Sequence, residues 1–144
     1  MNEEQLRENP SAMNERIIKE FRLSGGKVGG DFENSLLLLL TVTGRKTGSP
    51  ITKPLVYLQD GVRWIVFASK AGAPRDPEWY SNLVCNPVVI VELGCEKFEA
   101  DTTIVTGEER DRLFSCQVAK YPRFGEYQKK TNRTIPVVAL SRRS

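Results

Sequence analysis

Histidine is the one residue type that this 144-residue sequence lacks altogether. Its absence excludes Ser–His–Asp triads, Cys–His pairs, and metal or haem sites with imidazole ligands. Cysteine is scarce, because Cys85, Cys95 and Cys116 are the only three and form no Cys-x-x-Cys pair. Their spacing fits neither a thiolate zinc site nor a disulfide framework. We therefore expect reduced, buried thiols in a cytoplasmic protein, and no bound metal.

Long apolar runs are also missing. The longest run, Leu36–Leu40, is far shorter than the ~20 residues that a membrane-spanning helix needs. The first ten residues, MNEEQLRENP, are polar and acidic, which is unlike a secretory signal. With 40% hydrophobic and 27% charged residues, the composition is typical of a soluble globular protein. The length is that of a single domain.

A large net charge of one sign is absent as well, since the formal net charge is +3. The charge is nevertheless unevenly distributed along the chain. Residues 41–75 carry six basic side chains against Asp60 alone, and residues 76–112 carry nine acidic side chains against three basic ones. Near-neutrality argues against a general polyanion binder, so the basic segment predicts a local anion site instead.

The N-terminal part of the sequence predicts an amphipathic helix followed by a glycine hinge. Residues 12–23 place four apolar side chains near one helical face, and four glycines follow within residues 25–30. Such a helix could dock on its own domain, lie on a membrane surface or be partly mobile. We expect residues 1–30 to form this unit and residues 31–144 to form the main domain.

From residue 36 onward the pattern indicates strands. Strands are expected at residues 36–42, 51–59, 62–69, 88–93, 97–105 and 135–140. Asp60-Gly61 is a strong hairpin signal, and Pro54 marks an edge or a bulge. Helices are expected at residues 77–84 (N-cap Asp76), 106–121 (capping box from Thr106) and 124–131. Because strands do not alternate with helices, we expect a small, mostly antiparallel barrel with peripheral helices.

Two loops carry side chains that suit a bound anion. The segment TGRKTGSP places Arg45 and Lys46 between glycines, where backbone N–H groups and two cations can hold an anion. A solvated basic turn is the alternative. Ser69 and Lys70 end a strand before a flexible loop of small residues, which forms either a ligand-binding lip or an exposed turn.

Three aromatic residues recur at three-residue spacing near the C-terminus: Tyr121, Phe124 and Tyr127. On helical turns they would form one ledge. This ledge either packs the mouth of the barrel or provides a stacking wall for a flat ligand.

Taken in order, these segments resemble the deazaflavin-dependent nitroreductase family, the coenzyme F420-dependent quinone reductases of actinobacteria. The resemblance covers roughly residues 30–140 and rests on the motifs TGRKTG, ASKAGA, PEWYSNL and TNRTIP. It implies a mainly β fold with peripheral helices, a split β-barrel of the FMN-binding type that binds the deazaflavin within residues 31–144. The implied activity is hydride transfer from reduced coenzyme F420 to a quinone, conjugated enone or nitroaromatic acceptor, chemistry that needs no histidine.

The resemblance also implies which residues form the site. The implied cofactor-binding residues are Arg45, Lys46, Thr47, Ile51, Thr52, Lys53, Pro54, Leu55, Val56, Phe67, Ala68, Ser69, Lys70, Glu78, Trp79, Tyr80, Ser81 and Asn82. Tyr121, Phe124 and Tyr127 frame the substrate. Ser69 and Tyr121 are the expected catalytic groups, because they could stabilise an oxyanion that develops on the acceptor. Phe124 replaces a tyrosine of family members that act on bulky nitroimidazoles.

The sequence leaves two other functions open. One is an FMN-dependent oxidase or reductase of the pyridoxamine-phosphate oxidase type, and the other is an oligonucleotide-binding barrel without enzyme activity. The acidic block at residues 76–112 argues against nucleic acid. We expect a small-molecule electron acceptor as partner, leave open contact of the N-terminal helix with the inner face of the cell membrane, and infer no oligomeric state.

Overall fold

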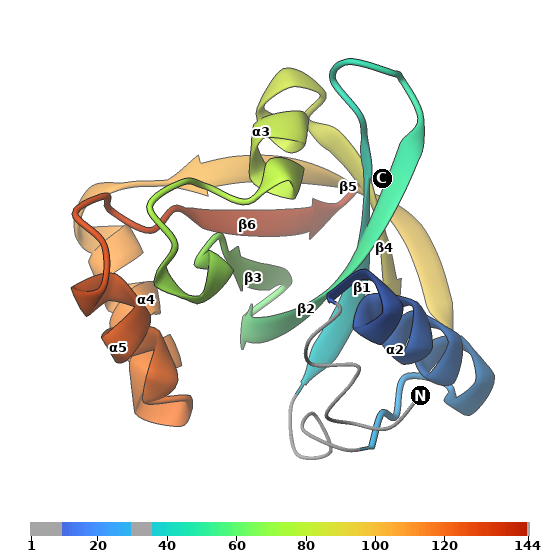
Figure 1. Ribbon diagram of the computed structural model, residues 1–144, viewed down its shortest axis with the longest axis horizontal. Helices are drawn as coiled ribbons and strands as arrows, with labels where there is room; N and C mark the ends of the chain where they lie inside the picture. Colours follow the sequence, from blue (N-terminus) through green and yellow to red (C-terminus); the bar gives the residue numbers. More distant parts are fainter. Residues whose placement is uncertain (1–9, 30–35, 144) are drawn as a thin grey trace.

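A closed antiparallel barrel of six strands makes up the centre of the computed structural model, which describes residues 10–29 and 36–143 (Figure 1). The strands are β1 (Leu37–Thr43), β2 (Pro50–Asp60), β3 (Arg63–Phe67), β4 (Val88–Leu93), β5 (Glu96–Val105) and β6 (Val137–Arg142). Their order around the barrel is β1-β2-β3-β6-β5-β4. This confirms the prediction of a mainly β split barrel with peripheral helices.

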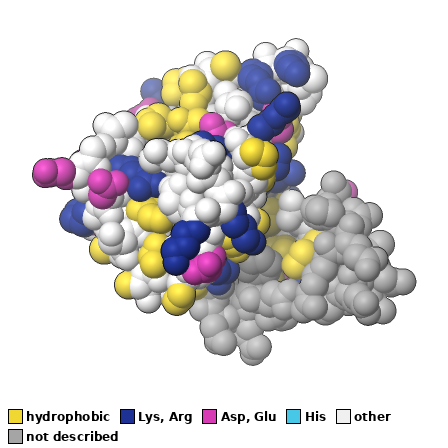
Figure 2. All heavy atoms as spheres, turned by 60° about the vertical axis from the view of Figure 1, so that its left-hand side comes forward, with side chains coloured by type: hydrophobic (Ala, Val, Ile, Leu, Met, Phe, Trp, Pro, Cys, Tyr) yellow, Lys and Arg dark blue, Asp and Glu magenta, His cyan; other side chains and the backbone are white. Residues whose placement is uncertain are grey.

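Helices lie around the outside of the barrel. In the described part of the chain they are α2 (Pro10–Ser24), the single 3-10 turn η2 (Lys70–Gly72), α3 (Glu78–Cys85), α4 (Gly107–Lys120) and α5 (Arg123–Lys129). Helices α4 and α5 lie together on one side, and α2 lies on the opposite side (Figure 1). On the side of the molecule where α4 and α5 lie, many basic side chains are interspersed with hydrophobic ones (Figure 2).

The leucine run of β1 is buried on both of its faces. Because successive strand side chains point to opposite faces, Leu38 and Leu40 enter the barrel interior, whereas Leu39 points outward. Helix α2 covers that outer face with Ile17 and Phe21, which are both buried. Burial of such a side chain contributes roughly 1.5–3 kcal/mol. The amphipathic helix therefore docks on its own domain.

The hairpin between β2 and β3 opens partway along its length. A two-residue turn, Gly61-Val62, joins the strands, and Gly61 has a φ of 62°, which glycine adopts without strain. Pairing runs from Asp60↔Arg63 to Tyr57↔Val66 and stops there. Residues 50–56 of β2 thus pair with β1 on one side only. This split is the feature that positions the site.

Pro54 lies in the unpaired half of β2. The Tyr57 N–H donates to the Leu36 carbonyl of the β1 side, and alternate residues along a strand direct their N–H groups to opposite sides. The nitrogen of Pro54 therefore faces the side without a partner strand, and its missing N–H costs no hydrogen bond. The prediction of an edge position at Pro54 is confirmed.

The predicted cap at Asp76 is wrong, and the predicted capping box at Thr106 is right in position but lacks its hydrogen bond. Asp76 does not cap α3, because Pro77 occupies the N-cap position and the Asp76 carboxylate pairs with Arg133 at 2.9 Å. Thr106 is the N-cap residue of α4, but its side chain makes no capping hydrogen bond. Gly107 follows it with a φ of 65°, so the backbone enters the helix by a path that a regular capping box does not have.

The prediction of buried cysteines is also wrong. All three thiols are free, as expected, but they are exposed. Cys95 lies in the β4–β5 turn, Cys85 is the last residue of α3, and Cys116 lies on the outer side of α4. Each position faces solvent because the barrel interior is filled by other side chains.

The expected boundary between residues 30 and 31 falls in a segment outside the described residues, so the division into two units stays a prediction. Within residues 10–29 and 36–143, no helix combines the length and hydropathy needed to cross a membrane.

Candidate functional site

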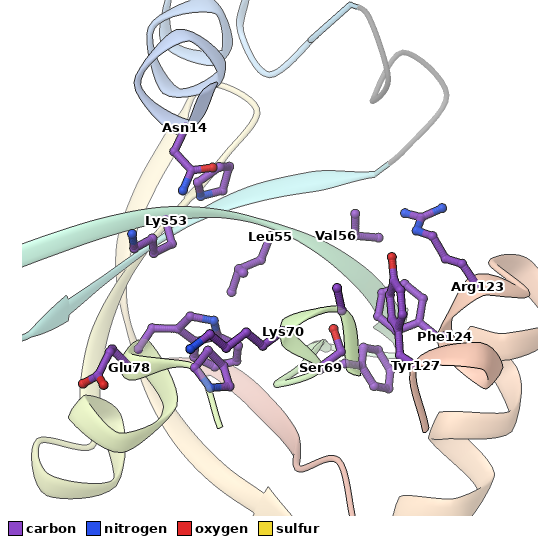
Figure 3. Close-up of a pocket in the computed structure, with 15 residues that line it drawn as sticks. Asn14, Lys53, Leu55, Val56, Ser69, Lys70, Glu78, Arg123, Phe124 and Tyr127 are labelled. Carbon is purple, nitrogen blue, oxygen red and sulfur yellow. The ribbon is translucent and has the colours of Figure 1, made fainter. Parts of the chain in front are cut away.

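A cavity of about 470 Å³ lies beside the unpaired half of β2 (Figure 3). Its walls come from β2, the end of β3 and the loop after it, the start of α3, α5 and one residue of α2. The lining residues are Asn14, Lys53, Pro54, Leu55, Val56, Phe67, Ser69, Lys70, Ala71, Pro77, Glu78, Trp79, Arg123, Phe124 and Tyr127. This volume is ordinary for a small-molecule site.

Arg133 holds the loop that forms the floor of this cavity. Its guanidinium donates to the carbonyls of Ala68, Ser69 and Ala73 at 3.1, 2.8 and 3.0 Å, and to the Asp76 carboxylate at 2.9 Å. Only 15% of the Arg133 side chain is exposed. These four bonds come from the arginine of the TNRTIP motif, so that motif acts here as a clamp on residues 68–76.

The clamped loop contains a strained turn. Lys70 and Ala71 have φ values of 46° and 52°, in the left-handed region that costs non-glycine residues about 1–2 kcal/mol each. Gly72 follows with a φ of 80°, and a Cβ there would lie 2.6 Å from the Tyr127 carbonyl oxygen of α5. Such strain persists only where the surroundings hold it, and it is concentrated at functional sites.

The loop between β1 and β2 is tied to α3. The backbone N–H and the Nη1 of Arg45 donate to Asn82 Oδ1 at 3.1 and 2.7 Å, and its Nη2 lies 2.8 Å from the Glu78 carboxylate. Asn82 is only 3% exposed. A hydrogen bond from Arg45 is the main cause that lowers the pKa of Glu78, with smaller contributions from nearby positive charges. Asn82 thus positions the TGRKTG loop and does not line the cavity.

Positive charge predominates in the cavity. Lys53, Lys70 and Arg123 line it, and none of the three forms an ion pair with another described residue. Glu78 is the one carboxylate among the lining residues, and Arg45 already pairs with it. Three unpaired cations beside a largely apolar wall are suited to a ligand that is both flat and anionic.

The aromatic ledge divides into two parts. Phe124 and Tyr127 line the cavity, with their ring centroids 5.2 Å apart, and Phe67 packs at 5.8 Å from Phe124. Tyr121 is 8% exposed, does not line the cavity, and accepts a hydrogen bond from the Leu36 N–H at 3.2 Å. This geometry favours the packing interpretation for Tyr121, so its catalytic role stays a prediction with no support from its placement.

The residues implied by the sequence fall into two groups. The structure brings together around the cavity Lys53, Pro54, Leu55, Val56, Phe67, Ser69, Lys70, Glu78, Trp79, Phe124 and Tyr127. It places outside the lining Arg45, Lys46, Thr47, Ile51, Thr52, Ala68, Tyr80, Ser81, Asn82 and Tyr121. Thr52, for example, shares a hydrogen bond of 2.7 Å with Thr41 across the β1–β2 pair.

Four lining residues were missed by sequence reasoning: Asn14, Ala71, Pro77 and Arg123. Ala71 and Pro77 lie within the motifs ASKAGA and PEWYSNL, and Arg123 lies between Tyr121 and Phe124, so these positions in the sequence could have indicated all three. Asn14 belongs to α2, and nothing in the sequence indicates where that helix docks.

Comparisons with known proteins show the family of this chain. The F420H(2)-dependent quinone reductase family matches residues 14–142. An F420H(2)-dependent quinone reductase of Mycobacterium tuberculosis is 37% identical over 127 residues, covering 85% of each chain. A solved F420-H2 dependent reductase (FDR-A) is 36% identical with a TM-score of 0.67, over 73% of this chain and 93% of that one. A solved domain-swapped dimer is 32% identical with a TM-score of 0.70, over 92% of this chain and 100% of that one. The chain therefore belongs to the F420H(2)-dependent quinone reductase family.

Proposed function

We propose that this chain transfers a hydride from reduced coenzyme F420 to a small flat acceptor, a quinone above all, and that both bind in the cavity beside β2. The observation that carries the proposal is the combination of three unpaired cations, Lys53, Lys70 and Arg123, with an aliphatic and aromatic wall. Family membership supplies the identity of the coenzyme. Enones and nitroaromatics are further acceptors of the same electronic type.

The residues present fit coenzyme F420. This coenzyme joins a flat deazaflavin ring to a phosphate and several glutamates, so it needs an apolar surface next to positive charge. Leu55, Val56 and Trp79 supply the apolar surface, and Lys53 and Lys70 supply cations beside it. Micromolar binding corresponds to about 8 kcal/mol, so it needs several charge-assisted hydrogen bonds of about 1.5–3 kcal/mol each, together with burial of the ring against the apolar surface.

The tail of the coenzyme also has candidate contacts in the TGRKTG loop. Lys46 and Thr47 are exposed, and Lys46 makes no ion pair with the described residues. Arg45 is already bound to Glu78 and Asn82. An anionic tail at Arg45 would therefore compete with the Glu78 carboxylate, which makes Lys46 the stronger candidate of the two cations.

The bound coenzyme supplies the hydride, and the protein supplies alignment. Phe124 and Tyr127 provide a wall on which a flat acceptor can stack. Ser69 lines the cavity and its hydroxyl makes no hydrogen bond to the described residues, so it can donate to an oxygen that gains negative charge. Alignment of the two reactants within a cavity lowers the entropic part of the barrier.

A paired titration tests this function. The protein is titrated with coenzyme F420 and with FMN, and reoxidation of reduced F420 is then followed with 1,4-naphthoquinone. We expect tighter binding of F420 and a loss of at least tenfold in its affinity for Lys53→Ala and Lys70→Ala. Lys129→Ala, on the exposed side of α5 and paired with Glu126, is the matched control. Tight binding of FMN with no F420-dependent turnover would favour the oxidase alternative.

A cytoplasmic location, at the membrane surface or away from it, stays a prediction. Peripheral membrane contact through α2 has less support, because its apolar residues Ile17 and Phe21 pack against the barrel. Leu23 is the remaining large apolar side chain exposed on α2 within the described residues. Vesicle co-sedimentation of the whole chain would test this contact.

A further inference from the structure

Arg123 is the cation of the cavity that sequence reasoning missed. It is the first residue of α5, and its guanidinium carbon lies 4.9 Å from the ring centroid of Tyr121 and 5.4 Å from that of Phe124. Both distances are within the range of a cation–π contact. The arginine is thus held against an aromatic surface at the edge of the cavity.

The N–H donors of Arg123 are not bound by the residues that the structure describes. Arg133 gives four hydrogen bonds to the loop after β3, and Arg45 is bound to Asn82 and Glu78. Arg123, by contrast, makes no hydrogen bond or ion pair with another described residue. A planar guanidinium has five N–H donors arranged to bind two oxygens of one anionic group.

The position of Arg123 separates it from the other charges of the cavity. Arg123 lies beside Phe124 and Tyr127, whereas Lys53 and Glu78 lie at the opposite side and Lys70 lies between (Figure 3). The aromatic side is the one assigned to the acceptor in the proposed function. A cation there faces the acceptor, while Lys53 and Lys70 remain for the coenzyme.

We propose that Arg123 is a specificity-determining residue, which binds an anionic substituent on the acceptor and makes the site prefer flat acceptors that carry a carboxylate or sulfonate. This inference rests on the proposed function. The stacking of the guanidinium on two rings reduces the conformational freedom that it loses when an anion binds. Because the side chain is exposed, the preference weakens as ionic strength rises.

A matched pair of acceptors tests the preference. Turnover of 1,4-naphthoquinone and of its 2-sulfonate is measured with reduced F420 for the parent protein, Arg123→Gln, Arg123→Lys and the control Lys129→Gln. We expect the ratio of kcat/KM, sulfonate over neutral quinone, to fall about tenfold in Arg123→Gln, mainly through KM. Tenfold corresponds to about 1.4 kcal/mol. Arg123→Lys should retain part of the ratio, and Lys129→Gln should leave it within twofold.

A binding measurement without the coenzyme completes the test. Isothermal titration with naphthalene-2-sulfonate, a probe that cannot be reduced by hydride, is compared with uncharged 2-naphthol. We expect Arg123→Gln to weaken binding of the sulfonate at least fivefold more than binding of 2-naphthol. This arm keeps its meaning even if the parent protein fails to oxidise reduced F420, an outcome that would overturn the proposed function alone.

Three results would overturn the inference. An unchanged sulfonate ratio together with unchanged probe binding means that Arg123 is only solvated. An equal loss for both acceptors with a lower melting temperature means that it supports aromatic packing. A tenfold loss of F420 affinity with an unchanged ratio means that the anion it binds is the phosphate or a carboxylate of the coenzyme.

Discussion

Replacement of Arg133 by lysine probes how the cavity floor is held. The arginine makes four hydrogen bonds, three to carbonyls of residues 68–73 and one to the Asp76 carboxylate. A lysine ammonium keeps the charge but has no planar fork, so it can retain the bond to Asp76 and at most one carbonyl. The buried carbonyl of Ala68 is among those at risk of losing its partner.

The magnitude follows from the number of bonds lost. Two or three hydrogen bonds from a charged donor contribute roughly 1.5–3 kcal/mol each, and water that reaches the loop offsets part of this loss. We expect Arg133→Lys to lower the free energy of unfolding by about 3–5 kcal/mol. At roughly 3 °C per kcal/mol for a chain of this size, the melting temperature should fall by about 10–15 °C.

The assay is urea unfolding followed by circular dichroism, combined with hydrogen exchange of the amides in residues 68–76. Exchange there should rise more than in β6, because the strained turn at Lys70 and Ala71 loses its support. Arg112→Lys is the control, since that arginine is 55% exposed and forms only a surface pair with Asp60. A change below about 1 kcal/mol in Arg133→Lys, equal to that of the control, would refute the clamp.

Three further predictions concern other contacts. Asn82→Ala removes the acceptor of two hydrogen bonds from Arg45 and should lower the free energy of unfolding by about 2–3 kcal/mol in the same urea assay. Asn82→Asp keeps an acceptor, so it should lower that free energy by less than half as much. Equal losses in the two variants would show that these bonds do not matter. Phe124→Tyr places a hydrogen-bond donor on the substrate wall. It should raise nitroimidazole turnover roughly five- to thirtyfold, while quinone turnover changes less than tenfold. An unchanged steady-state kcat/KM for the nitroimidazole contradicts this. A hydrogen bond from Arg63, and a weaker effect of one from Arg112, lower the pKa of Asp60. These contacts therefore stabilise the fold above the usual carboxyl pKa of about 3.9, and their contribution is lost as the pH falls below that value. Asp60→Asn should therefore reduce stability by up to about 1 kcal/mol at pH 7 and by less at pH 2.5; an equal reduction at both would contradict the sign.

Local signals account for the strands and the turns that could be predicted. The β1 leucines, the hairpin signal at Asp60-Gly61 and Pro54 all act through residues that are adjacent in the chain, or through the two-residue period of a strand. A turn dipeptide limits the backbone wherever it lies, so the order of hairpins and the antiparallel barrel could be inferred before any contact was known. The predicted cap at Asp76 failed because a distant side chain, Arg133, pairs with that carboxylate.

The site depends instead on contacts between residues far apart in the chain. Arg45 meets Asn82 across 37 positions, and Arg133 reaches the loop after β3 across 57 to 65 positions. Residue types and motifs indicated that these residues are important. They did not indicate that the residues bind one another instead of a ligand. Closure of the barrel decides where β2 separates from β3 and which side of β1 helix α2 covers. It thereby also decides which side chains line the cavity, because only closure brings these segments together.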